Sequence, residues 1–172
     1  AVPTPQELAQ AGALLTPPQM TLFLRLQPSE QAHSLNIFRQ LIDQGEENRD
    51  LLVAALLHDV GKCLYPLSLW DRVLAVLAKG LFPARARDWG WAEPRGWRRA
   101  FVVAEQHPRW GAALAAQAGC TPLTVNLIRR HQSPDSYLQL NGDPVLRTED
   151  SPNSKFLENQ LLQRLQLFDE EN

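Results

Sequence analysis

Cysteine is scarce in this chain of 172 residues, which has only Cys63 and Cys120. The two lie far apart and in no spacing typical of a metal site, so we expect two free thiols in a reducing compartment, that is, a cytoplasmic protein. No apolar run approaches the roughly 18 residues of a membrane span, and no signal peptide is recognisable. The net charge of −2 gives no overall attraction to nucleic acid or to an anionic membrane, so we expect neither as a partner.

Strand signals and internal repeats are also scarce. Only Val145-Leu146 reads as extended, which is too little for a sheet, and no repeat or low-complexity tract divides the chain. Hydrophobic residues make up 44% and charged residues 21% of the sequence, the profile of a soluble globular protein that can bury a substantial core. We therefore predict an all-α fold, a single-domain helical bundle over residues 1–172 with about seven to nine helices.

Apolar residues at helical spacing fall into separate segments that proline often opens and glycine often closes. Thr4-Pro5 and Thr121-Pro122 are typical helix starts, and Gly45 and Gly119 are typical helix ends. We interpret His107-Pro108 as a junction between two helices, because proline disrupts a helix interior. Helices are expected at about residues 5–15, 17–26, 30–44, 48–60, 67–79, 97–106, 108–118, 122–131 and 154–169.

The most informative segment is the apolar run Leu51–Leu57 with the polar residues that follow it. The run contains no glycine or proline and is apolar on every side, which indicates a helix buried in the middle of the domain. It leads into His58 and Asp59 and, three residues later, Lys62. Burying ionisable groups is costly unless they are paired or bind a metal. The segment therefore indicates either a salt-bridged His-Asp pair or a functional site.

All four histidines of the chain lie at predicted helix ends. A single histidine on an apolar face is more often structural than a ligand. Here His33 lies near the start of one helix and His58 ends the buried run. His107 stands at the predicted helix junction, and His131 closes an apolar helix. None is scattered on a solvated face, which favours a shared role for the set.

The order of these residues resembles that of the HD-domain metal-dependent phosphohydrolases. The segment AALLHDVGK (54–62) closely matches the signature that names the family, and EQHPRWGA (105–112) resembles the histidine segment of its two-metal members. The segments QAHSL (31–35), IRRHQ (128–132) and LQLFD (165–169) resemble its first histidine, its last histidine and its closing aspartate. Asp135, Asp143 and Asp150 are alternatives for that aspartate, and Asp169 is preferred because it ends an apolar helix.

The resemblance implies an HD-type fold, with its core over about residues 20–170, and a two-metal site. In the family's scheme one metal is held by His33, His58, Asp59 and Asp169 and the second by His107, His131 and Asp59, which bridges the two. Imidazole and carboxylate ligands suit divalent Fe, Mn, Co, Ni or Zn better than Mg. A metal-bridging hydroxide then attacks a phosphomonoester or a nucleotide-type phosphoester or anhydride. The implied partner is a small phosphorylated substrate, a class that includes nucleotides.

Further groups are expected to contact this substrate. Lys62 follows Asp59 by three residues and can share its helix face, where the ammonium can hold a phosphate oxygen; we therefore name Asp59 and Lys62 as catalytic. Residues 81–97 are rich in Trp, Pro, Gly and Arg and do not read as a regular element. We predict that one or more of Arg85, Arg87 and Arg95 faces the metal cleft and holds phosphate. The alternative is a scaffold loop pinned by its tryptophans.

A non-catalytic HD module, which binds a nucleotide or a protein partner around a structural metal, is the alternative to an enzyme. Ligands at every family position favour the enzyme, because a binding module has no need of an open two-metal centre. The cyclic-dinucleotide phosphodiesterases of the family carry a further Gly-Tyr-Pro motif. This chain lacks it, since Leu64-Tyr65-Pro66 stands elsewhere and has no glycine. The spacing also resembles that of symmetrical dinucleoside tetraphosphatases, so phosphoester and anhydride substrates both stay open.

Overall fold

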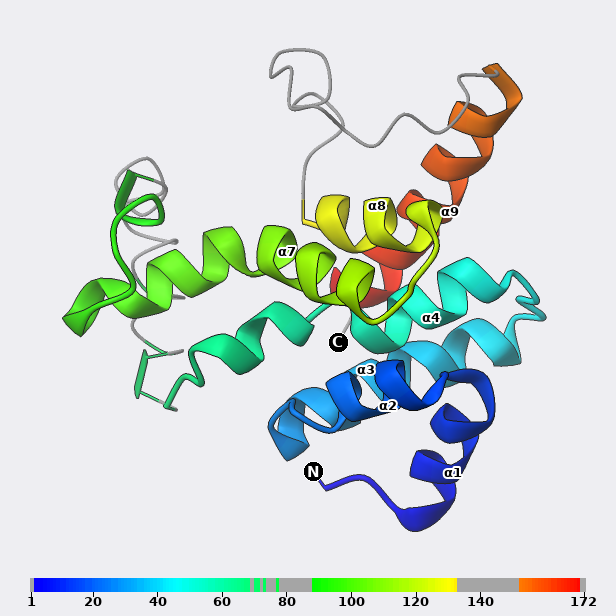
Figure 1. The fold of residues 1–172 in the computed structure, drawn as a ribbon, viewed down its shortest axis with the longest axis horizontal. Helices are drawn as coiled ribbons and strands as arrows, with labels where there is room; N and C mark the ends of the chain where they lie inside the picture. The colour runs from blue at the N-terminus through cyan, green and yellow to red at the C-terminus, as the bar shows by residue number, and fades with distance from the viewer. Residues whose placement is uncertain are drawn as a thin grey trace.

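The structure, a computed structural model, describes residues 2–68, 70, 71, 73, 77, 88–132 and 152–170. Within these residues it is all-helical and has no strand, which confirms the predicted fold class (Figure 1). The elements are α1 (Pro5–Leu14), α2 (Pro17–Phe23), α3 (Pro28–Asp43), α4 (Arg49–Leu57), the 3₁₀ helices η1 (Val60–Leu64) and η2 (Gly96–Arg98), α7 (Arg99–Gln117), α8 (Pro122–Arg130) and α9 (Pro152–Glu170). None of the helices in the described ranges is long and apolar enough to cross a membrane.

Helix α4 forms the centre of the core. Every residue from Leu51 to Leu57 is buried, as expected for a helix that is apolar on all sides. Helices α3, α8 and α9 all pack against it, and Figure 1 shows α4 between α3 on one side and α8 and α9 on the other. The burial of so many apolar side chains supplies the main driving force of folding. It also fixes the position of the residues that follow α4 in the chain.

Side-chain caps set several of the helix starts. The hydroxyl of Thr4 accepts a hydrogen bond from the backbone N–H of Glu7, whose carboxylate accepts the N–H of Thr4 in return. Asn48 caps α4 by accepting the N–H of Leu51, and Thr121 caps α8 in the same way. A cap of this kind contributes about 1 kcal/mol to stability. The predicted starts at Thr4-Pro5 and Thr121-Pro122 are confirmed.

The predicted break at His107-Pro108 is wrong, because α7 continues through Pro108. Proline removes one helical hydrogen bond and costs about 3 kcal/mol in a helix interior. Here residues on both sides of Pro108 are buried, including Val103 before it and Ala112 and Ala115 after it. Tertiary packing of one continuous face therefore outweighs the local cost. His107 consequently lies in the middle of a long helix rather than at an end.

The chain turns at the end of α4 earlier than predicted. The helix was expected to reach Val60, but it ends at Leu57, and His58 and Asp59 lie in the turn before η1. From there η1 runs along α7, with which it packs closely.

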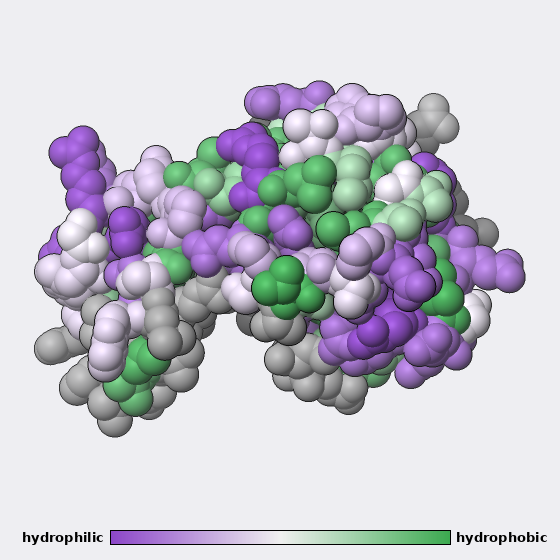
Figure 2. All heavy atoms as spheres, turned by 90° about the horizontal axis from the view of Figure 1, so that it is seen from below, coloured by the Kyte–Doolittle hydropathy of each residue, from purple (hydrophilic) through white to green (hydrophobic). Residues whose placement is uncertain are grey.

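At the outer end of α7 a second, smaller apolar cluster joins Ala100 and Phe101 to side chains from earlier segments. Figure 2, viewed from below, shows mostly hydrophilic residues on this face with hydrophobic ones gathered near the middle.

Candidate metal centre

Five separate elements bring the predicted ligands together. His33 comes from α3, His58 and Asp59 from the turn after α4, His107 from α7, His131 from the end of α8 and Asp169 from the last turn of α9. His58, Asp59, His107 and His131 are buried, whereas His33 and Asp169 are partly exposed. The cluster is therefore buried at His58, Asp59, His107 and His131 and open to solvent at His33 and Asp169.

Asp59 lies at the middle of the cluster and turns its two carboxylate oxygens to different groups. Its Oδ1 is 3.1 Å from Nε2 of His107 and 3.9 Å from Nε2 of His131. Its Oδ2 is 3.5 Å from Nε2 of His58 and 2.5 Å from Nζ of Lys62. A carboxylate oriented in this way can hold two metal ions at once, one on each oxygen.

Asp169 joins the other two histidines on the accessible side of the cluster. Its Oδ1 is 3.0 Å from Nε2 of His33 and 3.4 Å from Nε2 of His58. Burial alone would raise the pKa of the Asp169 carboxyl, but these two imidazoles hold that pKa well below its usual range. Asp169 is thus an ionised carboxylate that faces two imidazoles. Asp135, Asp143 and Asp150, the alternatives considered from the sequence, lie outside the described residues.

Backbone carbonyls fix the orientation of the three buried histidines. Nδ1 of His58, His107 and His131 each bonds a carbonyl oxygen from the preceding helical turn, at 2.9, 2.8 and 2.7 Å. A carbonyl only accepts, so each Nδ1 carries a proton and each ring turns Nε2 to the centre, where its neutral form offers a lone pair. This arrangement is the usual support of a metal-binding histidine.

Several polar atoms of the cluster have no satisfactory partner within the described protein. Nε2 of His58 and Oδ1 of Asp59 are buried and make no hydrogen bond there. Nε2 of His107 and Nε2 of His131 face one another at 3.3 Å, although two bare lone pairs repel. Orphaned buried polar atoms of this kind are costly, and cations held by the candidate ligand groups would satisfy all four. The donor set therefore fits divalent metal ions.

Three overlapping groups of ligand atoms could hold a metal, each within 4.8 Å. They are His33, His58 and Asp59; His58, His131 and Asp169; and Asp59, His107 and His131. Together these groups include all six residues predicted as ligands. Mixed imidazole and carboxylate ligands favour Mn, Fe, Co, Ni or Zn over Mg.

Burial and charge set the protonation of the cluster. Burial lowers the pKa of His131 to about 3 and also lowers the pKa of His107. Burial alone would raise the pKa of Asp59, but Lys62 and the neighbouring imidazoles hold that pKa well below its usual range. His58 differs: burial would lower its pKa, but the two nearby carboxylates outweigh burial and raise it. At neutral pH His107, His131 and Asp59 are thus already in the deprotonated form that binds a metal.

Two glycines, for which the sequence predicted no role, allow η1 to approach α7. A Cβ added at Gly61 would lie 2.0 Å from the backbone oxygen of His107 and 2.8 Å from the backbone nitrogen of Gly111. The backbones therefore touch, and this contact brings Asp59 within reach of His107. The sequence did contain a signal, because the motifs 54–62 and 105–112 each include one glycine. Neither glycine has a positive φ, so backbone conformation does not require it and close packing does.

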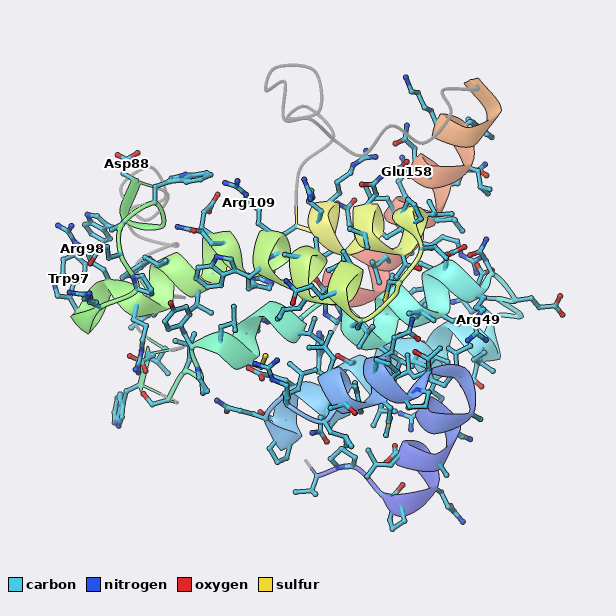
Figure 3. The ribbon with its side chains drawn as sticks, viewed as in Figure 1. Arg49, Asp88, Trp97, Arg98, Arg109 and Glu158 are labelled. Carbon is cyan, nitrogen blue, oxygen red and sulfur yellow. The ribbon has the colours of Figure 1, made fainter. Side chains whose placement is uncertain are left out.

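The groups predicted to contact substrate lie in different places. Lys62 is beside Asp59, as its spacing predicted, and is partly exposed. Arg95 pairs with Glu93 at 3.2 Å and has 85% of its side chain exposed. In Figure 3 its near neighbours Trp97 and Arg98 lie at the outer end of α7, away from α4 and α8. Arg85 and Arg87 lie outside the described residues, so a phosphate-binding role for the loop stays a prediction.

The fold and the cluster define this chain as an all-α protein with a buried group of histidines and aspartates that could bind metal ions. Compared with protein-family models, curated proteins and solved structures, the chain matches none of them significantly.

Proposed function

We propose that this protein is a metal-dependent phosphohydrolase of the HD-domain type, with a small phosphomonoester or a nucleotide-type phosphoester or anhydride as its substrate. The observation that supports the proposal most is the orientation of Asp59. Its two oxygens face two different sets of imidazole nitrogens, and the three buried rings hold Nδ1 on backbone carbonyls with Nε2 turned to the centre. A purely structural metal needs one closed shell of ligands, and a shared carboxylate between two sets is typical of a two-metal hydrolase.

The chemistry of a metal pair suits this reaction. When bound, two divalent ions supply a water of lowered pKa and positive charge facing the phosphoryl oxygens. Hydrolysis breaks the P–O bond to the leaving group and forms one from water, and the leaving oxygen gains a proton. His33, Asp169 and Lys62 are the partly exposed groups of the cluster, so a substrate can reach the cluster through them.

Lys62 is placed to hold the phosphate. Its ammonium donates a hydrogen bond to Oδ2 of Asp59 at 2.5 Å and has 26% of its side chain exposed. An ammonium has three N–H donors, so two remain for phosphate oxygens while the third keeps the side chain on Asp59. A compact positive charge at this point stabilises the charge of the phosphoryl group during transfer. We therefore assign Asp59 to metal binding and Lys62 to the substrate.

The proposal is tested by loading the purified protein with Mn²⁺, Fe²⁺, Co²⁺, Ni²⁺ or Zn²⁺ in turn. Each preparation is then assayed against a phosphomonoester, a cyclic nucleotide and a dinucleoside polyphosphate. We expect about two equivalents of metal, hydrolysis of at least one of the three classes, and loss of activity on chelation. Binding of metal with no hydrolysis of any class would instead favour the non-catalytic module.

A lysine variant separates substrate binding from metal binding. Lys62→Met should keep the wild-type metal content and lower kcat/KM by at least about tenfold, or ~1.4 kcal/mol. Lys155→Met provides the matched control, because Lys155 is an exposed lysine of α9 outside the cluster. Equal kcat/KM values for the Lys62 and Lys155 variants would remove Lys62 from the reaction.

A further inference from the structure

We propose that Tyr65 and Trp110 form a stacking subsite for the planar base of a nucleotide, next to the phosphate position at Lys62. The inference rests on the proposed function and narrows it, because it selects nucleotides among the small phosphorylated substrates. It is carried by the contact between the two rings and by the register of η1 and α7.

Tyr65 stands at the opposite end of η1 from Asp59 and the metal cluster. The backbone N–H of Lys62 donates to the carbonyl of Asp59 at 2.9 Å, and the N–H of Tyr65 donates to the carbonyl of Lys62 at 3.2 Å. Asp59 is the N-cap of η1 (Val60–Leu64) and Tyr65 is its C-cap, with φ −139° and ψ 77° outside the helical region. Asp59, Lys62 and Tyr65 therefore stand at the start, in the middle and at the end of η1.

Exposure increases along η1 from the metal cluster to Tyr65. The side chain of Asp59 is 3% exposed and that of Lys62 is 26% exposed, and Tyr65 as a residue is 37% exposed. A substrate with its phosphate on the ammonium of Lys62 would thus extend its leaving group outward, past Tyr65. A large hydrophobic ring at this point is partly open to solvent and available for contact.

Trp110 reaches the same place from α7. It follows His107 by three residues, so the two side chains point within about 60° of each other around the helix. The ring centroids of Tyr65 and Trp110 are 5.2 Å apart, with an interplanar angle of 48°. The adjacent Arg109 points to the opposite side of α7, where it stacks on Trp91, and Figure 3 shows it projecting away from η1. Trp110, and not Arg109, therefore lies on the side of α7 that faces Tyr65.

The chemistry of the pair fits a nucleobase. Aromatic side chains bind bases by stacking, and this stacking is sequence-tolerant because every base has a π-face. A leaving group without a ring, such as glycerol, cannot make this contact. The subsite should therefore favour nucleotides over aliphatic phosphates without selecting strongly among the bases.

The test compares two substrates on the Mn²⁺-loaded protein: adenosine 5′-monophosphate and glycerol 3-phosphate. We expect Tyr65→Ala to lower kcat/KM for the nucleotide about tenfold and to leave glycerol 3-phosphate unchanged. Tyr65→Phe keeps the ring and should retain the preference, as should Trp110→Phe. Trp97→Ala is the control, because this exposed tryptophan lies at the outer end of α7 (Figure 3).

Equilibrium binding distinguishes failure of this subsite from failure of the proposed hydrolysis. Calorimetry with the non-hydrolysable phosphonate analogues of both substrates should show the same Tyr65-dependent preference, even if neither substrate is turned over. Equal losses for both substrates in Tyr65→Ala, or no loss for either, would overturn the subsite and leave the hydrolase standing. Tyr65-dependent nucleotide binding without hydrolysis of either substrate would support the subsite and count against the enzyme.

Discussion

The contact between Gly61 and α7 gives the sharpest test of how the fold builds the metal cluster. In Gly61→Ala the new Cβ would stand 2.0 Å from the carbonyl oxygen of His107, where ordinary contact begins at 3.4 Å. The two backbones must separate by up to 3.4 − 2.0 = 1.4 Å, since neither partner is a flexible side chain. Overpacking of this kind costs about 1–3 kcal/mol and occasionally more.

The same displacement changes the metal cluster on one side only. Oδ1 of Asp59 and Nε2 of His107 are 3.1 Å apart, and metal sites tolerate errors of only about 0.2 Å in ligand distance. We expect Gly61→Ala to lose the metal held with His107 and to keep about one equivalent at His33, His58 and Asp169. Elemental analysis measures the metal content, and urea unfolding measures the stability.

Two further glycine variants provide a control and a second test of the contact between η1 and α7. Gly12→Ala in α1 is the control: its Cβ would meet nothing within 4 Å, so it should stabilise the protein by about 0.5–1 kcal/mol. Gly111→Ala should act like Gly61→Ala but more weakly, because its closest contact would be 3.2 Å. It supplies the test if Gly61→Ala fails to fold. Two bound equivalents and an unchanged urea midpoint in Gly61→Ala would show that the close approach is not needed.

Three other outcomes follow from the geometry. Asp59→Ala should lose both metals, because Asp59 is the shared ligand, and full occupancy by elemental analysis would rule out bridging. His107→Ala should keep roughly one equivalent and lose most of its turnover, whereas wild-type turnover with one metal would indicate mononuclear chemistry. The metal-free protein should lose stability as the pH falls below 6.5, because His131, with its pKa lowered to about 3, stays neutral when folded while the unfolded chain takes up a proton. Urea unfolding at pH 7 and 5 should show that His131 lowers the free energy of unfolding by about 2 kcal/mol, and His131→Gln should remove this loss. The raised pKa of His58 acts in the opposite direction in both proteins. An equal pH dependence of the unfolding free energy in the wild type and in His131→Gln would contradict the assignment to His131.

Local features of the sequence were enough to predict the all-α fold and most of its helix starts. The run Leu51–Leu57 is apolar on every side, and a helix of that kind has no stable place except the core. The caps at Thr4 and Thr121 act within one helical turn, so no distant residue is needed to predict them. The contact between Lys62 and Asp59 is equally local, because three residues along one helical element bring two side chains together.

Features that depend on long-range packing were decided only by the tertiary structure. Pro108 predicts a helix break by itself, but the burial of residues on both sides of it keeps α7 continuous. The sequence left several aspartates as candidates for the last position, and the packing of α9 against α3 and α4 places Asp169 beside His33. Which oxygen of Asp59 faces which imidazole follows from η1 and α7 touching at Gly61. These arrangements join segments up to 136 residues apart, and periodicity within a segment carries no information about such distances.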